Sequence, residues 1–521
     1  MKFTHYILVG LLGLCCTGCN NQPEAVTSTL SVKEGRLIDS RQRTVILNGV
    51  NHVVKDPKQG YVYHDDERLF KQFRIWGINC IRYGIHWDGL EPEPGKINEA
   101  YLAEIDKRVQ WARDNDLYLI LDMHQDLYGK KFDNGAPVWA TLDEGLPHIT
   151  GQVWSDAYLM SPAVQKAFDN FWKNAPAADS VGIQDHYINV WKTLAKRYAD
   201  STSVIGFDVF NEPFMGTRAQ SVFQKLMEGC AVYLAEKKHR MISEEEIMDI
   251  WTDEKKRTEM LEMLDDQETF HRILQYASEL VDSFEKHELS HFYQKLRDAV
   301  RSTGNKQILF LEHNYFCNMG IESTFKVPLM ANGKQDTLCA YAPHAYDLVV
   351  DTDGATHPGF KRLNTIFEQL QVAATKRHLP LLIGEWGAFY MGDNYKEPAA
   401  HQIGWIAKLL AGHTYWSWWP DMEKQDYFDV AISRPYPQYI NGRLVSYEYD
   451  MKSNVFTCEW EESGDDANSR FFMPDISLFK EETLELTPAT SVQFSAITEG
   501  TTAGYLEIEP TNGHRTLTIH F

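Results

Sequence analysis

The stretch "FDVFNEPF", residues 207–214, decides the fold. Apolar and polar residues alternate along it, and the run ends on Asn211 and Glu212 immediately before Pro213. Proline has no N–H to give to a strand ladder, so the pattern predicts a buried strand that stops at the proline. A carboxylate at the end of a buried strand is costly unless it has a partner or a function.

Strand-like and helix-like segments alternate on both sides of this stretch. The strand-like segments are residues 46–51, 80–87, 117–126, 204–213, 307–314, 338–346, 380–389 and 413–420. The helix-like segments include residues 100–116, 186–199, 360–378 and 399–413. Such alternation predicts parallel strands joined by helices. Eight strands in this order predict an α/β fold, the (β/α)8 TIM barrel.

Two glutamates end separate strands of the predicted barrel. Glu212 ends the fourth strand in "FNEP", and Glu385 ends the seventh in "IGEW". The carboxyl ends of the strands meet on the active-site face of such a barrel, so we expect the two side chains to lie close together. Glycoside hydrolysis needs two such carboxylates, which in retaining enzymes lie about 5–5.5 Å apart. One then acts as nucleophile and the other as acid/base.

Residues 31–431 are predicted to form the barrel, and two regions depart from its rhythm. Residues from about 217 to 300 are charged and helix-prone, with a capping box at Ser243 and Glu246. We interpret them as a helical insertion after the fourth strand; an enlarged barrel helix with an excursion would give a similar pattern. Residues 432–521 alternate in period two and contain turn signals such as "NG", which predicts a C-terminal antiparallel β-sandwich.

The first 19 residues predict an export signal. Lys2 supplies a positive start, and the apolar run that follows is too short to span a bilayer. "CTGC" then places Gly18 before Cys19, which resembles the lipobox of bacterial lipoproteins. The resemblance implies a lipoprotein signal peptide over residues 1–19, lipid modification of Cys19 and a polar tether over residues 20–30. It implies a cell-envelope lipoprotein at the outer membrane or cell surface; a plain secretory signal, and hence a secreted protein, is the alternative.

The composition narrows the classes of partner. A formal net charge of −22 argues against nucleic acid, which binds basic patches. Three of the eight cysteines lie in the signal segment, and the others are widely spaced without a CxxC pair. Neither a metal site nor a disulfide framework is therefore implied, and no cofactor is expected. The sequence leaves the oligomeric state open, and a monomer is compatible with it.

The order of these motifs along the chain resembles glycoside hydrolase family 5, in clan A of the retaining glycosidases. The resemblance rests on "NEP" at the fourth strand and a glutamate at the seventh. It implies that Glu212 is the acid/base, that Glu385 is the nucleophile and that Asn211 holds the sugar 2-hydroxyl. The other site residues that it implies are Arg82 beside the nucleophile, His124, His344, Tyr346, and Trp416 beneath the −1 sugar.

Four further motifs resemble the endoglycoceramidases, which cut the β-glucosidic bond between an intact glycan and ceramide. They are "LDMHQDLYGKKFDNGAPVWA", "FDNFW", "PHAYD" and "RPYP". The resemblance implies that His124 and Asp126 bind hydroxyls of the −1 sugar. It implies that Lys55 and Trp172 bind the glycan or lie near it. A glycosphingolipid would then be the substrate, and the lipid anchor would hold the enzyme at a membrane surface.

Three other functions remain open at this point. A β-glucosidase acting on glucosylceramide or a steryl glucoside would need a closed cleft for one sugar. A polysaccharide endoglucanase would need a long groove on both sides of the glutamates, and the motifs "DMHQDLYG" and "RPYP" argue against it. A non-catalytic glycan-binding lipoprotein would be favoured by the loss of either glutamate, and both are present.

Overall fold

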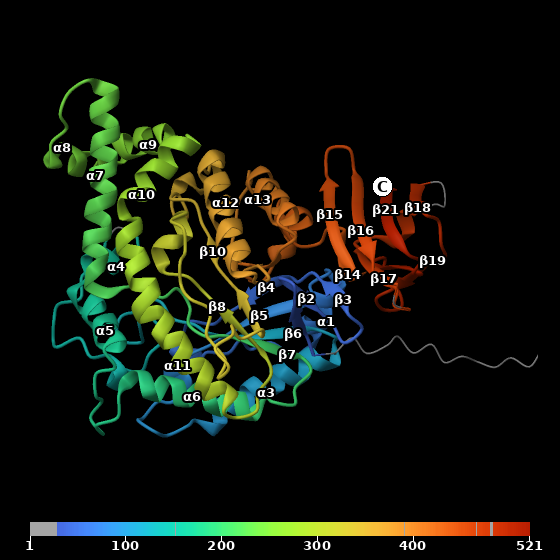
Figure 1. The fold of residues 1–521 in the computed structure, drawn as a ribbon, viewed down its shortest axis with the longest axis horizontal. Coiled ribbons are helices and arrows are strands. Elements are labelled where there is room, and N and C mark those ends of the chain that lie inside the picture. The colour runs from blue at the N-terminus through green and yellow to red at the C-terminus, as the bar shows by residue number, and fades with distance from the viewer. Residues whose placement is uncertain (1–28, 152, 390, 465, 480–482) are drawn as a thin grey trace, which may run out of the picture.

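The computed structural model describes residues 29–521 except residues 152, 390, 465 and 480–482. The predicted signal peptide, Cys19 and all but the last two residues of the predicted tether therefore lie outside the described residues. A helical insertion, a barrel and a β-sandwich follow one another along the longest axis of the molecule (Figure 1). Within the described part of the chain, no helix has the length and hydropathy that a bilayer-spanning segment needs.

Eight parallel strands form the barrel, as predicted. They are β4 (Asn48–His52), β5 (Cys80–Ile85), β6 (Tyr118–Met123), β7 (Val204–Asp208), β8 (Ile308–Leu311), β9 (Cys339–Tyr341), β11 (Leu382–Ile383) and β13 (Gly412–Tyr415). Their hydrogen-bonded order is β11-β13-β4-β5-β6-β7-β8-β9. The N–H of Tyr341 on β9 donates to the carbonyl of Pro380, just before β11, at 2.9 Å. This hydrogen bond links β9 to the segment before β11, the two strands at the ends of that order, and so closes the barrel. The predicted fold class is confirmed.

Helices that follow the strands cover the outside of the barrel (Figure 1). They are α1 (Glu67–Ile75), α3 (Glu99–Asp114), α6 (Ile183–Arg197), α11 (Ser290–Arg301), α12 (Phe360–Arg377) and α13 (Lys396–Lys408). Two shorter helices, α4 (Asp156–Met160) and α5 (Pro162–Trp172), lie in the long loop between β6 and α6. Between β8 and β9 the described chain forms a 3₁₀ turn, Tyr315–Met319, in place of a barrel helix.

Inward-facing side chains change from apolar to charged along the strands. Because successive strand residues point to opposite faces, every second residue enters the barrel. Cys80 on β5 and Phe310 on β8 belong to the apolar cluster at the amino-terminal end of the barrel interior. Arg82 and Glu312, each two residues further along, are fully buried. The barrel therefore has an apolar floor and a charged layer directly beneath its mouth.

The C-terminal β-sandwich is confirmed, but it also includes strands from the start of the chain. One sheet has the order β1 (Ser31–Lys33), β2 (Arg36–Ile38), β3 (Arg43–Val45), β14 (Tyr436–Asn441), β17 (Ser469–Met473), β20 (Gly504–Ile508) and β19 (Val492–Ala496). The other has the order β15 (Arg443–Asp450), β16 (Val455–Glu462), β21 (Gly513–His520) and β18 (Leu484–Thr487). Phe456 and Trp460 of the second sheet pack against Phe471 of the first.

The predicted boundary of the barrel at residue 31 is therefore wrong, because β1–β3 belong to the sandwich. Strand β3 pairs with β14, from the other end of the chain, and local sequence gives no sign of such a pairing. Leu37 and Val45 of these strands, with Tyr439 of β14, join the apolar floor of the barrel. The sandwich thus closes the amino-terminal end of the barrel and leaves the carboxyl end open.

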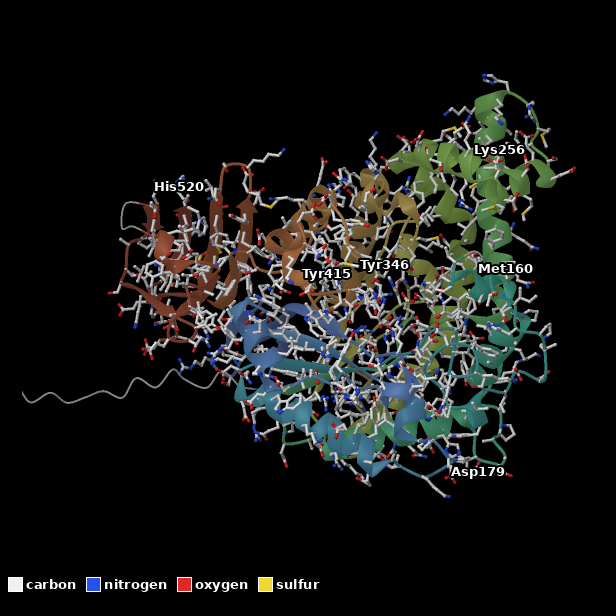
Figure 2. All side chains as sticks on the ribbon, turned by 180° about the vertical axis from the view of Figure 1, so that it is seen from behind. Met160, Asp179, Lys256, Tyr346, Tyr415 and His520 are labelled. Atoms are coloured by element: carbon white, nitrogen blue, oxygen red, sulfur yellow. The ribbon has the colours of Figure 1, made fainter. Side chains whose placement is uncertain are left out.

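The insertion consists of four helices stacked beyond the barrel. They are α7 (Ala219–Lys238), α8 (Glu244–Thr252), α9 (Glu254–Met263) and α10 (Gln267–Phe284). The Ser243 hydroxyl accepts the Glu246 N–H at 3.1 Å, so the predicted cap of α8 is present. Lys256 lies at the outer end of the insertion, far from Tyr346 in the middle of the molecule (Figure 2).

The predicted end of the insertion near residue 300 is wrong. A π-helical turn, Glu285–Leu289, joins α10 directly to α11. Helix α11 packs against α6 and leads into β8, so it is the barrel helix that follows β7. The insertion therefore ends at the π turn. Both interpretations of this region hold in part: the chain has a helical insertion, and its last helix is continuous with the barrel helix.

Candidate active site

The backbone changes direction sharply just after strand β7. Glu212 has a φ of 47°, in the left-handed region that few non-glycine residues adopt. Its N–H donates to Glu312 Oε2 at 2.7 Å, which stabilises this conformation. Strand β7 itself ends at Asp208, earlier than the predicted end at Pro213, and the turn that follows presents Asn211 and Glu212 at the mouth of the barrel.

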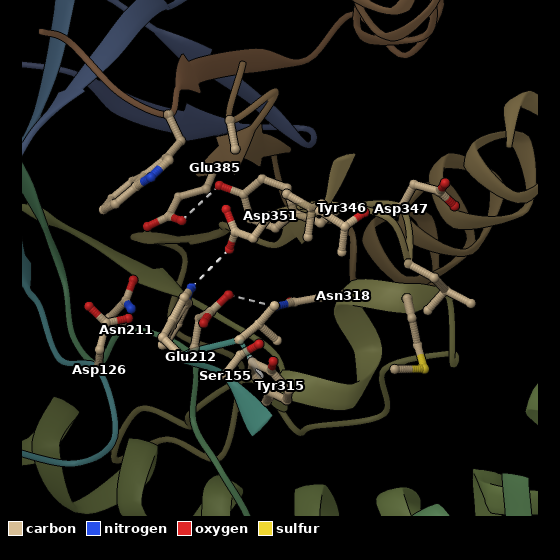
Figure 3. Close-up of a pocket in the computed structure, with 18 of the residues that line it drawn as sticks. Asp126, Ser155, Asn211, Glu212, Tyr315, Asn318, Tyr346, Asp347, Asp351 and Glu385 are labelled. Atoms are coloured by element: carbon tan, nitrogen blue, oxygen red, sulfur yellow. Dashed lines mark hydrogen bonds between the residues drawn. The ribbon is translucent and has the colours of Figure 1, made fainter. Parts of the chain in front are cut away.

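The two predicted catalytic glutamates lie on opposite sides of one pocket (Figure 3). Short strands β10 (His344–Ala345) and β12 (Glu385–Trp386) pair in parallel, with His344 directly beside Glu385. His344 Nδ1 lies 2.9 Å from Glu212 Oε1 and 3.5 Å from Glu385 Oε2. One oxygen of each glutamate lies within 4.8 Å of the other. This separation fits retaining chemistry and is shorter than the about 6.5–9.5 Å of inverting enzymes.

Most of the predicted site residues come together in this pocket of about 320 Å³. Those that line it are Lys55, His124, Asp126, Asn211, Glu212, Tyr346, Glu385 and Trp416. Arg82 and His344 lie directly beneath the pocket and are fully buried. Their positions are therefore consistent with the prediction that these residues form one site.

Arg82 holds the charged layer together. Its NH1 donates to Glu385 Oε1 at 2.8 Å, and its Nε donates to Asp208 Oδ2 at 2.8 Å. Its NH2 lies 2.9 Å from both Glu312 Oε1 and Asp122 Oδ1. A buried arginine with this many carboxylate partners fixes the position of each of them, because the fork of the guanidinium is rigid.

The charges around the glutamates set the protonation of the site. Burial raises the pKa of Glu385 above its ordinary value of 4.5, and the positive charges of His344 and Arg82 oppose this shift. Although burial acts to lower the pKa of His344, the carboxylates of Glu312 and Glu385 raise it well above its ordinary value. His344 is therefore a cation at neutral pH, and it donates its Nδ1–H toward Glu212.

Tyr346→Phe should move the acidic limb of the pH–kcat/KM profile to higher pH by about one unit. The Tyr346 hydroxyl donates to Glu385 Oε2 at 3.0 Å and so favours the charged form of that carboxylate. Its loss raises the pKa of Glu385 further, and the nucleophile is protonated over a wider acidic range. Tyr198→Phe, whose hydroxyl donates to Asp106 outside the site, is the control. An acidic limb that stays in place would contradict the assignment of Glu385.

A second group of side chains forms the polar wall of the pocket. Lys55 Nζ lies 2.7 Å from Asp126 Oδ2 and 4.6 Å from the centre of the Trp416 ring. The Trp154 ring centre lies 5.6 Å from the same ammonium group. Although burial acts to lower it, the Asp122 and Asp126 carboxylates raise the pKa of His124 to about 9. An indole face beside charged donors and acceptors is suited to a sugar ring.

Trp172, predicted to bind the glycan or to lie near it, does not line this pocket. Its Nε1–H donates to the carbonyl of Phe214 at 2.7 Å, and its ring packs edge-on against Phe284 and Phe292. These contacts place it between α5 and the insertion, outside the pocket lined by the other residues. Trp154, further back in the same loop region, lines the pocket instead. A single aromatic residue in the sequence does not reveal which of the two roles it has.

Several residues of the site were missed from the sequence. Glu312 follows β8 in "FLEHN", a strand-end carboxylate like Glu385, and that signal was available. Asn318, Trp154 and Asp351 lie on loops, where no periodic pattern marks them. Trp154 Nε1–H donates to Asp351 Oδ2 at 2.9 Å, which links the loop after β6 to the loop after β10 at the pocket.

Two groups of side chains in the described residues bring their atoms close enough for a metal ion. They are Glu212, His344 and Glu385, and Asp122, Asp208 and Glu312. Arg82 forms ion pairs with all three carboxylates of the second group, and His344 pairs with both glutamates of the first. Both groups are therefore explained as ion-pair networks of the protein itself.

Two sequence families match this chain. "Cellulase (glycosyl hydrolase family 5)" matches residues 38–422, which include the barrel and both glutamates. The chain belongs to glycosyl hydrolase family 5. The "glycoside hydrolase family 5 C-terminal domain" matches residues 434–519, which form most of the sandwich. The family 5 resemblance inferred from the motifs is therefore confirmed.

The individual relatives of this family 5 chain include endoglycoceramidases. One from Cyanea nozakii is 30% identical over 241 residues, which cover 40% of this chain and 47% of the relative. Endoglycoceramidase I of Rhodococcus hoagii (strain 103S) is 31% identical over 207 residues, which cover 39% and 40%. The match thus spans less than half the length of each relative.

The fold as a whole is also similar to a solved structure. Endo-glycoceramidase II from Rhodococcus sp., in complex with ganglioside GM3, superposes with a TM-score of 0.71 at 21% identity. The superposition covers 94% of this family 5 chain and 99% of that chain. The likeness shows that the two proteins share the barrel and the sandwich.

Proposed function

We propose that this protein is a retaining endo-β-glycosidase that hydrolyses the bond between the glycan and ceramide of glycosphingolipids. The observation that carries the proposal is the glutamate pair, whose nearest oxygens lie within 4.8 Å, in a pocket lined by both polar and apolar side chains. Glu212 is the acid/base and Glu385 the nucleophile in this proposal. The similarity to endoglycoceramidases supports the choice of substrate class.

The pocket brings polar and apolar side chains together. Lys55, Asp126 and Trp416 follow β4, β6 and β13 and form the polar wall. Met319, Leu348 and Val350, which follow β8 and β10, line the pocket with apolar side chains beside the polar Asn318 and Asp351. In this proposal an intact glycan lies against the polar wall and the lipid aglycone contacts the apolar side chains, because each buries surface of its own kind.

The geometry supports a double displacement. In the first step, a Glu385 oxygen attacks the anomeric carbon while the Glu212 proton passes to the glycosidic oxygen, and ceramide leaves as an alcohol. In the second step, Glu212 takes a proton from water, and the water oxygen attacks the same carbon and releases Glu385. The Arg82 and Tyr346 donors stabilise the Glu385 charge before the first step and as it is released in the second. The glycan leaves with its β configuration retained.

A β-glucosidase that removes single glucose residues from glucosylceramide or a steryl glucoside is the second candidate. The hydrogen bond between Trp154 and Asp351 favours this β-glucosidase, because a link between two loops that line the pocket restricts the space for a long glycan. Endo-acting cleavage requires that the Trp154–Asp351 hydrogen bond opens or that the glycan passes beside it.

The full-length protein should be incubated in detergent with lactosylceramide, a ganglioside, glucosylceramide and a cello-oligosaccharide, and the products identified by mass. Intact glycan and free ceramide from the first two substrates are the expected result. Glucose from glucosylceramide alone would favour the second candidate. Cleavage of the cello-oligosaccharide alone would leave the glutamates as catalytic residues and exclude the lipid substrate.

We also propose that the protein is an exported lipoprotein anchored through Cys19. The basis is the "CTGC" motif after a short apolar run, followed by a polar tether. A lipid anchor would hold the catalytic pocket near membrane substrates. Metabolic labelling with a fatty acid should label the wild type and not Cys19→Ser; equal labelling of the two would exclude this site of modification.

A further inference from the structure

Glu212 Oε1 accepts two hydrogen bonds inside the pocket. Asn318 Nδ2 donates to it at 2.6 Å (Figure 3), and His344 Nδ1 lies 2.9 Å from the same oxygen. Asn318 lies in the 3₁₀ turn after β8 and is only 8% exposed. Both donors fall on one oxygen of the carboxylate, so the two oxygens of Glu212 are not equivalent.

A directional chain of hydrogen bonds fixes the orientation of the Asn318 amide. His313 Nε2 lies 2.7 Å from Asn318 Oδ1, and His313 Nδ1 lies 2.7 Å from the Tyr341 hydroxyl. Burial lowers the pKa of His313 to about 3, so the ring is neutral and carries one proton. Nε2–H must then donate to Asn318 Oδ1, while Nδ1 accepts from Tyr341. This leaves the amide nitrogen of Asn318 facing Glu212.

The loop that carries Asn318 is anchored by a carboxylate from the π turn. Glu285 is fully buried and accepts the N–H of Asn314 at 2.7 Å, before the 3₁₀ turn. It also accepts the Ser323 hydroxyl at 2.9 Å and the N–H of Phe325 at 3.1 Å, after the turn. One side chain thus holds both ends of the loop. Departures from regular helix geometry of this kind are frequent at functional sites.

We propose that Asn318 is a positioning residue for the acid/base. By keeping Oε1 of Glu212 an acceptor, it directs the catalytic proton to Oε2, the oxygen left to face the leaving group. In the first step, the Oε2–H bond breaks and its proton goes to the glycosidic oxygen as the bond from that oxygen to the anomeric carbon breaks. In the second step, Oε2 takes a proton from water. The inference uses the role of Glu212 in the proposed function but not the ceramide substrate.

Other groups also face Glu212. They are Glu312 after β8, His344 on β10, Glu385 on β12, and the hydroxyls of Tyr158, Tyr315 and Tyr346. Asn318→Ala leaves all of these in place and removes one neutral donor to the charged carboxylate. The alkaline limb of the pH–kcat/KM profile should therefore move to higher pH, because the charged form loses a hydrogen bond.

The test compares two lactosides on the full-length enzyme. Octyl β-lactoside has a poor leaving group that needs a proton, and 2,4-dinitrophenyl β-lactoside has a good one that does not. For Asn318→Ala, kcat/KM should fall by about 10- to 100-fold on the octyl lactoside, the effect of losing a hydrogen bond to a charged group. It should change less than about threefold on the dinitrophenyl lactoside, since proton donation is not needed there. The alkaline limb should shift only in the variant.

A second variant guards against a simple failure to fold. Tyr341→Phe keeps the ring and removes the hydroxyl that fixes the His313 tautomer, so it should produce a smaller change with the same leaving-group dependence. Tyr198→Phe is the matched control and should behave as wild type. Equal loss on both lactosides, or an alkaline limb that does not move, would show a merely structural role and overturn the inference.

The outcomes separate this inference from the proposed function. Neither lactoside contains ceramide, so an enzyme that cleaves both but releases nothing from glycosphingolipids would refute the proposed substrate and still test Asn318. A wild-type enzyme that cleaves neither lactoside would contradict both proposals. Full activity of Asn318→Ala on the octyl lactoside would show that His344 alone positions the proton.

Discussion

Glu385→Ala should lower kcat on a β-lactoside by about 10⁴- to 10⁶-fold and leave the fold intact. The carboxylate forms the covalent bond to the sugar, so its removal eliminates the first step rather than weakening it. Arg82 keeps its other carboxylate partners, Asp208 and Glu312, so the charged layer stays paired. The measurement is steady-state kinetics together with a thermal midpoint.

Chemical rescue distinguishes a lost nucleophile from a damaged site. Azide is small enough to enter the space left by the carboxylate, and with the dinitrophenyl lactoside it should give the α-glycosyl azide. Glu397→Ala, an exposed residue in the first turn of α13, is the control and should have wild-type kinetics. Retention of more than about 1% of kcat by Glu385→Ala would remove this residue from the mechanism.

Arg82→Lys should lower the free energy of unfolding by about 3 kcal/mol and also move the acidic limb of the pH profile to higher pH. Arg82 contacts Asp122, Asp208, Glu312 and Glu385 through its fork, and an ammonium group cannot reach all of them in the same geometry. Glu385 then loses a charged donor, so its pKa rises above the already raised value. Chemical denaturation and the pH dependence of kcat/KM measure the two effects.

Arg108→Lys provides a matched control. Arg108 is also buried and pairs with Asp65 and Glu104, but it lies on α3, outside the pocket. Its replacement should destabilise the protein without moving the acidic limb. A limb that moves equally in both variants would show that it reports general instability, and the link between Arg82 and the nucleophile would fail.

The barrel was predictable because its signals are local. Each strand is a short apolar run with a polar end, and each helix carries its own periodicity, so "FDVFNEPF" and "IGEW" identify their strands without tertiary information. That β1–β3 belong to the sandwich was not predictable, because Val45 on β3 pairs with Tyr439, almost the whole chain away. Long-range antiparallel pairing leaves no trace in a single local segment.

The site divides in the same way. Arg82 could be placed because it lies on barrel strand β5, and His344 and Glu385 because they follow β9 and β11, where the barrel geometry directs side chains toward the mouth. Asn318 and Trp154 could not, because loops without periodicity bring them there. Trp172 shows the opposite case, in which a residue with suitable chemistry packs against Phe284 and Phe292 outside the pocket.

The most direct test of the central claim follows the first-formed product of lactosylceramide by time-resolved NMR, with the full-length protein in detergent. The account predicts that β-lactose and free ceramide form together, before mutarotation produces the α-anomer. Initial α-lactose would contradict the carboxylate assignment, and initial galactose with glucosylceramide would contradict cleavage at the ceramide bond.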